Sequence, residues 1–274
     1  MSVATPLTPS VPDHSSSNPL QDWWNGTSRI GTWWTLAWYD IKLRYRRSML
    51  GPLWLTISMG ALLLGMGPLY ATLFNTDIKS FFPHLALGII FWTFISGIIN
   101  ESCGVFTSVS GHLKHAESPI SLFAWRCLAK NVIQLAHQIL LYLPIAWWFA
   151  VPLKPSALLF IPGFVLLVIN LHAIEISLGI VGSRFRDVGQ IVASVTTFLM
   201  FLTPVIWLPD SLPQRAKFIL ANPFAQMLAL VRDPLLGKVC PPSVWMGMLG
   251  WTAVNVTIAA LIFSWKRRQV VYWV

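Results

Sequence analysis

His172 and Glu175 are the side chains in this sequence whose types and spacing come nearest to acid–base chemistry. They stand three positions apart in a long apolar stretch, so a helix would place both on one face. Ionisable side chains inside a membrane-spanning segment are candidates for a functional role. A proton relay across a bilayer needs a chain of such groups, and the sequence offers only this pair. We therefore weigh packing between helices first, a pathway-lining or coupling role second, and catalysis third.

A second group that could bind a ligand is a run of four cations, Lys42, Arg44, Arg46 and Arg47, directly before an apolar stretch. Such a run can do no more than hold the N-terminus on the cytoplasmic side of a membrane. It can also attract anionic lipid. Because only 11% of the chain is charged, this concentration favours a working surface on the cytoplasmic face.

The glycine pattern excludes nucleotide hydrolysis by a phosphate-binding loop in this chain. The only Gly-Lys dipeptide, Gly237-Lys238, is followed by Val239 instead of Ser or Thr, and Arg232 stands where the first glycine belongs. No set of His, Asp and Glu has convincing metal-ligand spacing either. We predict no catalytic site, no metal and no cofactor in the chain, and any energy must come from a partner or an ion gradient.

The composition is that of a membrane protein. Hydrophobic residues make up 55% of the 274 residues and charged residues 11%, against roughly 25% charged in soluble domains. The net charge of +9 then indicates orientation and lipid contact, not nucleic-acid binding. Cys103, Cys127 and Cys240 are too few and too scattered for a disulfide framework. The Ser- and Pro-rich start lacks the features of a signal peptide and predicts a disordered cytoplasmic tail over 1–28.

Apolar runs predict an all-α integral membrane protein with six transmembrane helices over 52–265. A bilayer crossing needs about 20 apolar residues, and the six runs are 52–74, 82–101, 131–151, 157–182, 190–208 and 245–265. Residues 216–231 are apolar but short, and Asn222-Pro223 interrupts them. Because Pro breaks a helix and restrains the residue before it, this segment predicts re-entrant half-helices between spans five and six.

The cations favour six spans over seven. Six spans place both termini on the side that holds most of the 19 lysine and arginine residues. A seventh span would send Lys266, Arg267 and Arg268 outside, against the rule that positive charge stays in the cytoplasm. We therefore expect both termini, including 266–274, in the cytoplasm.

Residues 29–51 predict an amphipathic helix in the plane of the membrane interface. One apolar stripe recurs with helical period: Trp34, Trp38, Ile41 and Tyr45. Asp40 and Arg44 fall on the opposite face as a favourable pair four positions apart. An aromatic face opposed by a basic one suits an interfacial helix.

Two stretches resemble the signatures of a known family. "LAWYDIKLRYRRSMLGPLWLTIS" (36–58) resembles the opening signature of permease subunits of type-2 ABC exporters of polysaccharides and polyol phosphates, and the Wzm-like branch that exports O-antigen is nearest. "SRFRDVGQIVASVTTFLMFLTPVIW" (183–207) and "ILANPFAQMLALVRDPLLG" (219–237) together resemble the second signature. The resemblance covers about 30–270 and leaves the N-terminal 25 residues outside.

This resemblance implies a homodimer in the bacterial inner membrane, with each copy docked on a separate cytoplasmic ATPase that binds ATP and magnesium. The substrate would be a lipid-linked polysaccharide, whose anionic head the cations at 42–47 could attract. The resemblance also implies a coupling loop between spans two and three (104–121) and a periplasmic gate segment (209–244). The residues expected to couple to the ATPase are Lys114, Glu117, Pro119, Arg184, Arg186 and Asp187. Those expected at the gate are Pro204, Asn222 and Pro223.

Other interpretations stay open for these residues. The loop at 104–121 could be an ordinary connector, and the cluster around Arg184 a plain interface anchor. Most of the 15 tryptophans suit the aromatic belts of a membrane protein. Aromatic residues within spans could stack on sugar rings along a translocation path, or could simply pack. With His172 and Glu175, the path candidates are Tyr70, Phe91, Trp92, Phe94 and Tyr142.

Three classes of function compete. A passive conduit driven by a separate ATPase fits best, with O-antigen, capsule and teichoic-acid polymers all open as substrates. A membrane-embedded glycan-modifying transferase would need clustered carboxylates or a His and Asp set on a loop, and the loops lack one. A structural or assembly subunit predicts that substitution of Glu117 or Arg186 leaves an ATPase coupled.

Overall fold

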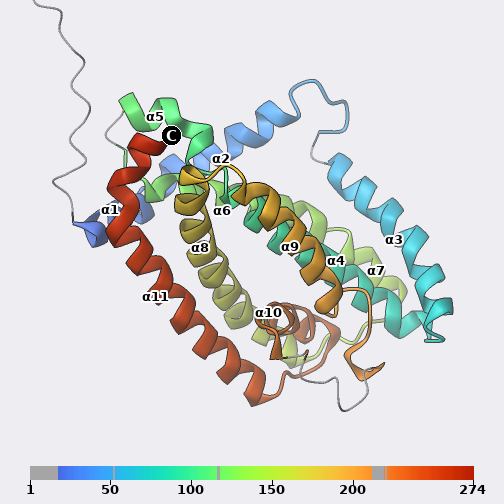
Figure 1. Cartoon of the computed structure of the whole chain (residues 1–274). Helices are drawn as coiled ribbons and strands as arrows, with labels where there is room; N and C mark the ends of the chain where they lie inside the picture. Colours follow the sequence, from blue (N-terminus) through green and yellow to red (C-terminus); the bar gives the residue numbers. More distant parts are fainter. Residues whose placement is uncertain (1–17, 52, 116–117, 212–218, 220) are drawn as a thin grey trace, which may run out of the picture.

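The structure is a computed structural model that describes residues 18–51, 53–115, 118–211, 219 and 221–274. In these ranges all regular secondary structure is helical (Figure 1). The predicted all-α class is therefore confirmed.

Four helices are long and apolar enough to cross a membrane. They coincide with the predicted spans one, two, four and six. Their bounds are α3 (Leu53–Leu73), α4 (Ile78–Ser102), α8 (Phe160–Arg184) and α11 (Pro242–Trp273).

The predicted third span, 131–151, is instead two helices, α6 (Ser121–Ile139) and α7 (Tyr142–Trp148). Pro144 lies in the first turn of α7 and has no N–H to donate to the carbonyl group of Leu140. The hydrogen-bond ladder therefore breaks at residues 140–141. This segment does not form the continuous helix that the hydropathy predicted.

The predicted fifth span is shorter than expected. α9 (Val188–Leu202) has 15 residues, about 22 Å of helix against a hydrocarbon core of roughly 30 Å. Thr203 takes an extended conformation, because a residue before proline is pushed away from helical geometry. Six full-length spans are thus not confirmed in the described part of the chain.

The N-terminal region corrects two predictions. The expected disordered tail becomes helical at α1 (Pro19–Ser28), where Asn18 caps the first turn and Pro19 takes the first helical position. Residues 1–17 lie outside the described ranges. α2 (Ile30–Arg44) ends earlier than the predicted 29–51 helix and is followed by a turn that reaches Gly51 at a φ of +55°.

The face that α2 buries also differs from the predicted stripe. Ala37 and Ile41 are buried against α6, whereas Trp34 and Trp38 are 46% and 43% exposed. Of the predicted stripe, Ile41 is buried in this contact and Tyr45 packs against it. The Trp33 ring also contacts α6, where it stacks on Trp125 with 5.8 Å between centroids. Trp34 and Trp38 lie on the outer surface of the helix.

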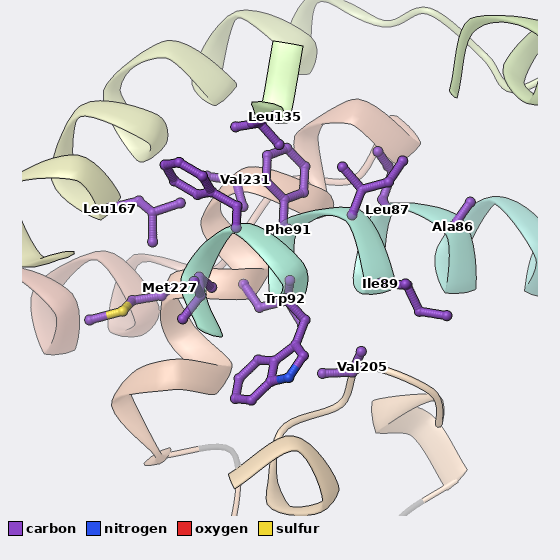
Figure 2. Packing of buried hydrophobic residues seen from close by; sticks show 14 of the residues in the cluster. Ala86, Leu87, Ile89, Phe91, Trp92, Leu135, Leu167, Val205, Met227 and Val231 are labelled. Atoms are coloured by element: carbon purple, nitrogen blue, oxygen red, sulfur yellow. The ribbon is translucent and has the colours of Figure 1, made fainter. Parts of the chain in front are cut away.

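α4 is the central helix and contacts α3, α6, α8, α9 and α10. In Figure 2, Phe91 is directed toward Leu135 and Trp92 toward Val205. Gly88 allows a close approach to this segment, since a Cβ there would clash with the carbonyl oxygen of Val205. α4 thus joins the interior of the bundle to the segment that follows α9.

Two polar links join α8 to α11 inside the bundle. The Asn170 amide donates to the Thr252 hydroxyl at 2.7 Å, and the Asn255 amide donates to the Asn170 carbonyl oxygen at 3.0 Å. Such bonds between helices are typical glue in membrane proteins.

The remaining helices gather at the two ends of the bundle. α1, α2, α5 (Ser110–His115) and the C-terminal end of α11 lie at one end, and α10 (Pro223–Arg232) at the other (Figure 1). The first of the two predicted re-entrant half-helices falls largely on residues 216–218 and 220, outside the described ranges. α10 corresponds to the second, but a re-entrant arrangement is not confirmed.

Candidate functional site

A cluster of charged side chains joins α2, α4 and α6 at the end of the bundle that holds the N-terminal helices. We call it the interface cluster: Asp40, Arg44, Glu101, Arg126 and Lys130. Arg126 Nε donates to Asp40 Oδ2 at 2.7 Å. Glu101 Oε2 forms an ion pair with Lys130 Nζ at 2.7 Å, and Glu101 Oε1 lies 3.6 Å from Arg44 Nη2. Five charges from three helices therefore form two adjacent ion-pair groups.

The interface cluster lines a cavity of about 480 Å³ between α2, α4 and α6. The Asn131 amide also donates to Glu101 Oε2 at 2.9 Å, so the carboxylate is held by α6 from two positions. Three cations and two carboxylates leave one positive charge in excess. A cavity with this balance can accept an anionic group.

The sequence prediction placed these charges differently. Asp40 pairs with Arg126 and not with Arg44, while Arg44 turns to Glu101. Of the four predicted cations only Arg44 belongs to the cluster. Lys42 Nζ lies 6.0 Å from the ring centroid of Trp38, and Arg46 and Arg47 are exposed beyond the helix end.

The two ends of the chain meet beside this cluster. Arg267 Nη1 of α11 lies 3.2 Å from Asp22 Oδ2 of α1, and both residues are buried. The Ser121 hydroxyl, at the start of α6, donates to Asp22 Oδ1 at 3.1 Å. One carboxylate thus ties α1 to both α6 and α11. Sequence reasoning missed this contact because the partners are so far apart in the chain.

The predicted coupling residues that the structure describes lie at the same end of the bundle, as Figure 1 shows for α5 and the α8–α9 junction. Lys114 belongs to α5, Pro119 precedes α6, and Glu117 lies outside the described residues. The Arg184 guanidinium is 5.6 Å from the ring centroid of Trp273.

The other two coupling residues form the α8–α9 junction. Arg186 and Asp187 are exposed there, and Asp187 precedes the first residue of α9. Both side chains are therefore accessible to a partner protein.

His172 and Glu175 pack between α8 and α6. The His172 ring stacks on Trp125 with 4.1 Å between ring centroids, and its Nδ1 lies 3.5 Å from Glu175 Oε2. Glu175 is fully buried. Among the described residues no three His, Cys, Asp or Glu side chains are grouped to hold a metal ion. The pair lies in a helix interface, and both ring nitrogens of His172 and both carboxylate oxygens of Glu175 are buried there without a hydrogen-bond partner in the part of the chain that the structure describes. Its role stays a prediction.

A second cluster, at the α10 end, contains the predicted gate residues. We call it the gate cluster: His84, Pro204, Asn222, Pro223 and Arg232. Asn222 caps α10 by accepting from the Phe224 N–H at 3.0 Å, and Pro223 takes the first helical position. The Asn222 amide reaches Thr203 Oγ1 at 3.4 Å. The structure thus brings the start of α10 against the end of α9.

Arg232 and His84 are the residues of the gate cluster that the sequence did not reveal, and Arg232 makes most of its contacts. The Arg232 side chain is 1% exposed, and Nη1 donates to the Pro204 carbonyl oxygen and approaches His84 Nε2 at 3.2 Å. Its Nε donates to Asp233 Oδ1 at 3.0 Å. A cation inside the apolar run "LALVRDPLL" was the available signal. The Arg232 side chain thus links the segment after α9 to α10 and α4.

The two clusters lie at opposite ends of α4. His84 and Glu101 are 17 positions apart in one helix, which corresponds to about 25 Å. One buried helix therefore connects the two clusters.

The aromatic path candidates mostly pack inside the chain. Phe91, Trp92 and Phe94 are buried, and their rings contact Phe160, Phe224 and Phe164 at centroid distances of 6.0, 6.4 and 6.0 Å, respectively. These contacts match the packing alternative.

The two tyrosines among the path candidates differ in exposure. Tyr142 is buried, and its hydroxyl donates to the Leu235 carbonyl oxygen at 3.3 Å. Tyr70 on α3 is only partly buried and stacks on Phe74.

Comparison with known proteins agrees with this architecture. Residues 32–236 match the family model described as ABC-2 type transporter. Two proteins called O-antigen export system permease protein RfbA, both from Klebsiella pneumoniae, are also similar. One is 22% identical over 81% of this chain and 86% of its own length. The other is 24% identical over 73% of this chain and 78% of its own length.

The matched range runs from α2, through the interface cluster, to the gate cluster and the end of α10. It covers most of the chain and three of the four long apolar helices. This multi-pass membrane protein therefore belongs to the ABC-2 type transporter family.

Proposed function

We propose that the chain is the transmembrane subunit of an ABC exporter that moves a lipid-linked polysaccharide, with O-antigen favoured, across the bacterial inner membrane. A separate ATPase subunit, which binds ATP and magnesium, supplies the energy. The observation that carries the proposal is the family match combined with the two O-antigen permease relatives. Capsule and teichoic-acid polymers are the alternative substrates.

A homodimer with two ATPase copies is the proposed assembly. α9 supports it, because this helix is apolar and yet exposed in the single chain: Ile191, Phe198 and Phe201 are 60%, 64% and 68% exposed. α3 is similarly apolar and open. In the proposal these two helices face the second copy or the path between copies, and Tyr70 is the path candidate on that side.

ATPase closure enters at the end that holds α5 and the α8–α9 junction. The proposed contacts are Lys114, Glu117, Pro119, Arg184, Arg186 and Asp187, with both termini on this cytoplasmic side. From there the interface cluster transfers movement of α2 and α6 to α4. α4 carries it about 25 Å to the gate cluster, as a rigid-body shift of packed elements.

The substrate head is proposed to bind at the same cytoplasmic surface. Lys42, Arg46 and Arg47 are exposed on or after α2, and the interface cavity has an excess of one positive charge. Cations in this position attract anionic lipid heads. Neutralising Lys42, Arg44, Arg46 and Arg47 together is expected to weaken binding of the lipid-linked glycan while the protein still inserts.

Deletion of the gene in its host, with complementation, tests the proposed function. We expect full-length lipid-linked polymer to accumulate in the cytoplasm and to disappear from the surface. Surface polymer that persists but lacks a substituent would contradict export and would point to a transferase with His172 and Glu175 as its first candidates. Unchanged polymer in both compartments would contradict both functions.

A further inference from the structure

An apolar groove of about 440 Å³ lies between α1, α8 and α11. Leu20 and Trp23 of α1 border it at one end, and Val168 and Ile169 of α8 line its side. The volume falls within the range of roughly 300–1,000 Å³ that is usual for ligand sites. The interface and gate clusters lie outside this groove, whereas the stacked rings of Trp125 and His172 also line it.

The groove is placed where hydrocarbon is the solvent. Its two long walls are α8 and α11, both of which are long and apolar enough to cross the membrane. Ile169 and Val256 on these walls remain 40% and 43% exposed. A chain of methylene groups is the chemistry that fits such a surface in a bilayer.

Ser264 and Arg268 of α11 connect the edge of this groove to a cation. Each step of four residues turns the helix by about 40°, so Val256, Ala260 and Ser264 shift gradually round α11, and Arg268 lies next to Ser264 one turn further on. The first three line the groove, and Arg268 is exposed one turn beyond Ser264. The groove therefore ends in a hydroxyl group and then a guanidinium group, which suits a phosphate diester.

We propose that this groove binds an anionic phospholipid, with one acyl chain along α8 and α11 and the phosphate held by Ser264 and Arg268. A second copy of the chain suits the groove less well. A symmetric contact would bring the patch that carries Arg268 against the same patch of the other copy, and like charges repel. The anionic lipid is complementary to this cation.

The bound lipid would also support α1. Trp23 of α1 borders the groove, and Asp22 beside it forms the ion pair with Arg267. The lipid and the ion pair would therefore both stabilise the contact between α1 and α11. This inference needs only that α11 spans the membrane, so it stands or falls independently of the transported substrate.

Native mass spectrometry of the full chain with phosphatidylglycerol or phosphatidylcholine tests the site. Arg268→Gln removes the phosphate ligand, and Lys266→Gln is its control, with the same charge change two positions away on another face. Ala260→Trp fills the groove, and Leu261→Trp is its control on an exposed position outside the groove.

We expect the wild type and both controls to retain phosphatidylglycerol in preference to phosphatidylcholine. Loss of one cation should weaken that binding about fivefold in Arg268→Gln, and Ala260→Trp should abolish the tightest-bound lipid. Size-exclusion profiles that match between Ala260→Trp and Leu261→Trp show that the filled groove still folds. Arg268→Gln tests the site without filling the groove.

Three results would overturn the inference. Equal losses in Arg268→Gln and Lys266→Gln would show only a general surface-charge effect. Equal retention of the two lipids by the wild type would exclude a phosphate site. An Ala260→Cys variant that forms a disulfide-linked dimer in membranes would show that a second copy covers the groove instead.

Discussion

Asp22 and Arg267 stand 245 positions apart and form an ion pair at 3.2 Å, both buried. This contact joins the first described helix to the last membrane-spanning one. It makes α1 a docked part of the bundle and not a tail. Because the pair is shielded from water, removing the Asp22 carboxylate takes away a counter-charge that the buried Arg267 has in the folded protein.

Asp22→Asn is therefore expected to lower the melting temperature, since a neutral amide no longer offsets the charge of the buried Arg267. A thermal-shift measurement on the purified protein in detergent gives the change. Asp210→Asn is the control, because Asp210 is exposed. Equal melting temperatures for the two variants would contradict the docked position of α1.

Arg232→Met is expected to abolish export by releasing the end of α9. The variant removes the donor to the buried Pro204 carbonyl oxygen and leaves His84 and Asp233 without the guanidinium. Arg232→Lys should also fail, because a single ammonium group cannot reproduce the several directions of a guanidinium.

Surface polymer, measured at equal membrane levels of the protein, checks this prediction. Lys238→Met is the control, since Lys238 is an exposed cation close in the chain. Normal export by Arg232→Met would show that the gate cluster does not control the path.

Glu101→Gln and Arg186→Glu are expected to separate coupling from docking. Glu101→Gln keeps an oxygen acceptor for Asn131 but removes the charge that holds Lys130 and Arg44. The ATPase should still co-purify and hydrolyse ATP while export falls. Arg186 is exposed at the α8–α9 junction, so its reversal should reduce co-purification. The same phenotype in both variants would contradict separate roles.

Cys240 should be nearly inert toward alkylating reagents. Burial raises the pKa of its thiol to about 12, and Sγ lies 3.3 Å from the Ala229 carbonyl oxygen as a donor. The folded state favours the protonated thiol, so its contribution to stability is full below a pH of about 8.5 and is lost as the pH rises toward 12.

In a Cys103→Ala, Cys127→Ser variant, iodoacetamide at a pH of about 8 should modify Cys240 at least about a hundredfold more slowly than in the denatured chain. Mass spectrometry at timed intervals gives the two rates. Similar rates would mean that the segment before α11 opens readily.

Local features of the sequence were predictable, and contacts across the chain were not. α3, α4, α8 and α11 follow from run length and hydropathy, which are properties of each segment. The break at Leu140 had a local signal in Pro144 that hydropathy masks. Asp40, by contrast, had an attractive neighbour in Arg44, but its partner Arg126 is 86 positions away. A helix pair at four positions gives only about 0.5 kcal/mol, which tertiary contacts readily exceed.

The gate cluster shows the same limit. Pro204, Asn222 and Pro223 were identifiable because Pro and Asn mark helix ends. Arg232 and His84 could not be joined to them, since nothing local shows that residues 148 positions apart share one buried site.

Reconstitution tests the central claim most directly. The chain and its ATPase partner, placed together in proteoliposomes, should move lipid-linked glycan to the opposite leaflet when ATP and magnesium are added, as measured by its accessibility to an added glycosidase. Arg232→Met should leave ATP hydrolysis measurable and the glycan protected. Glycan that stays protected with the wild type, or that becomes accessible without ATP, would contradict an ATP-driven exporter.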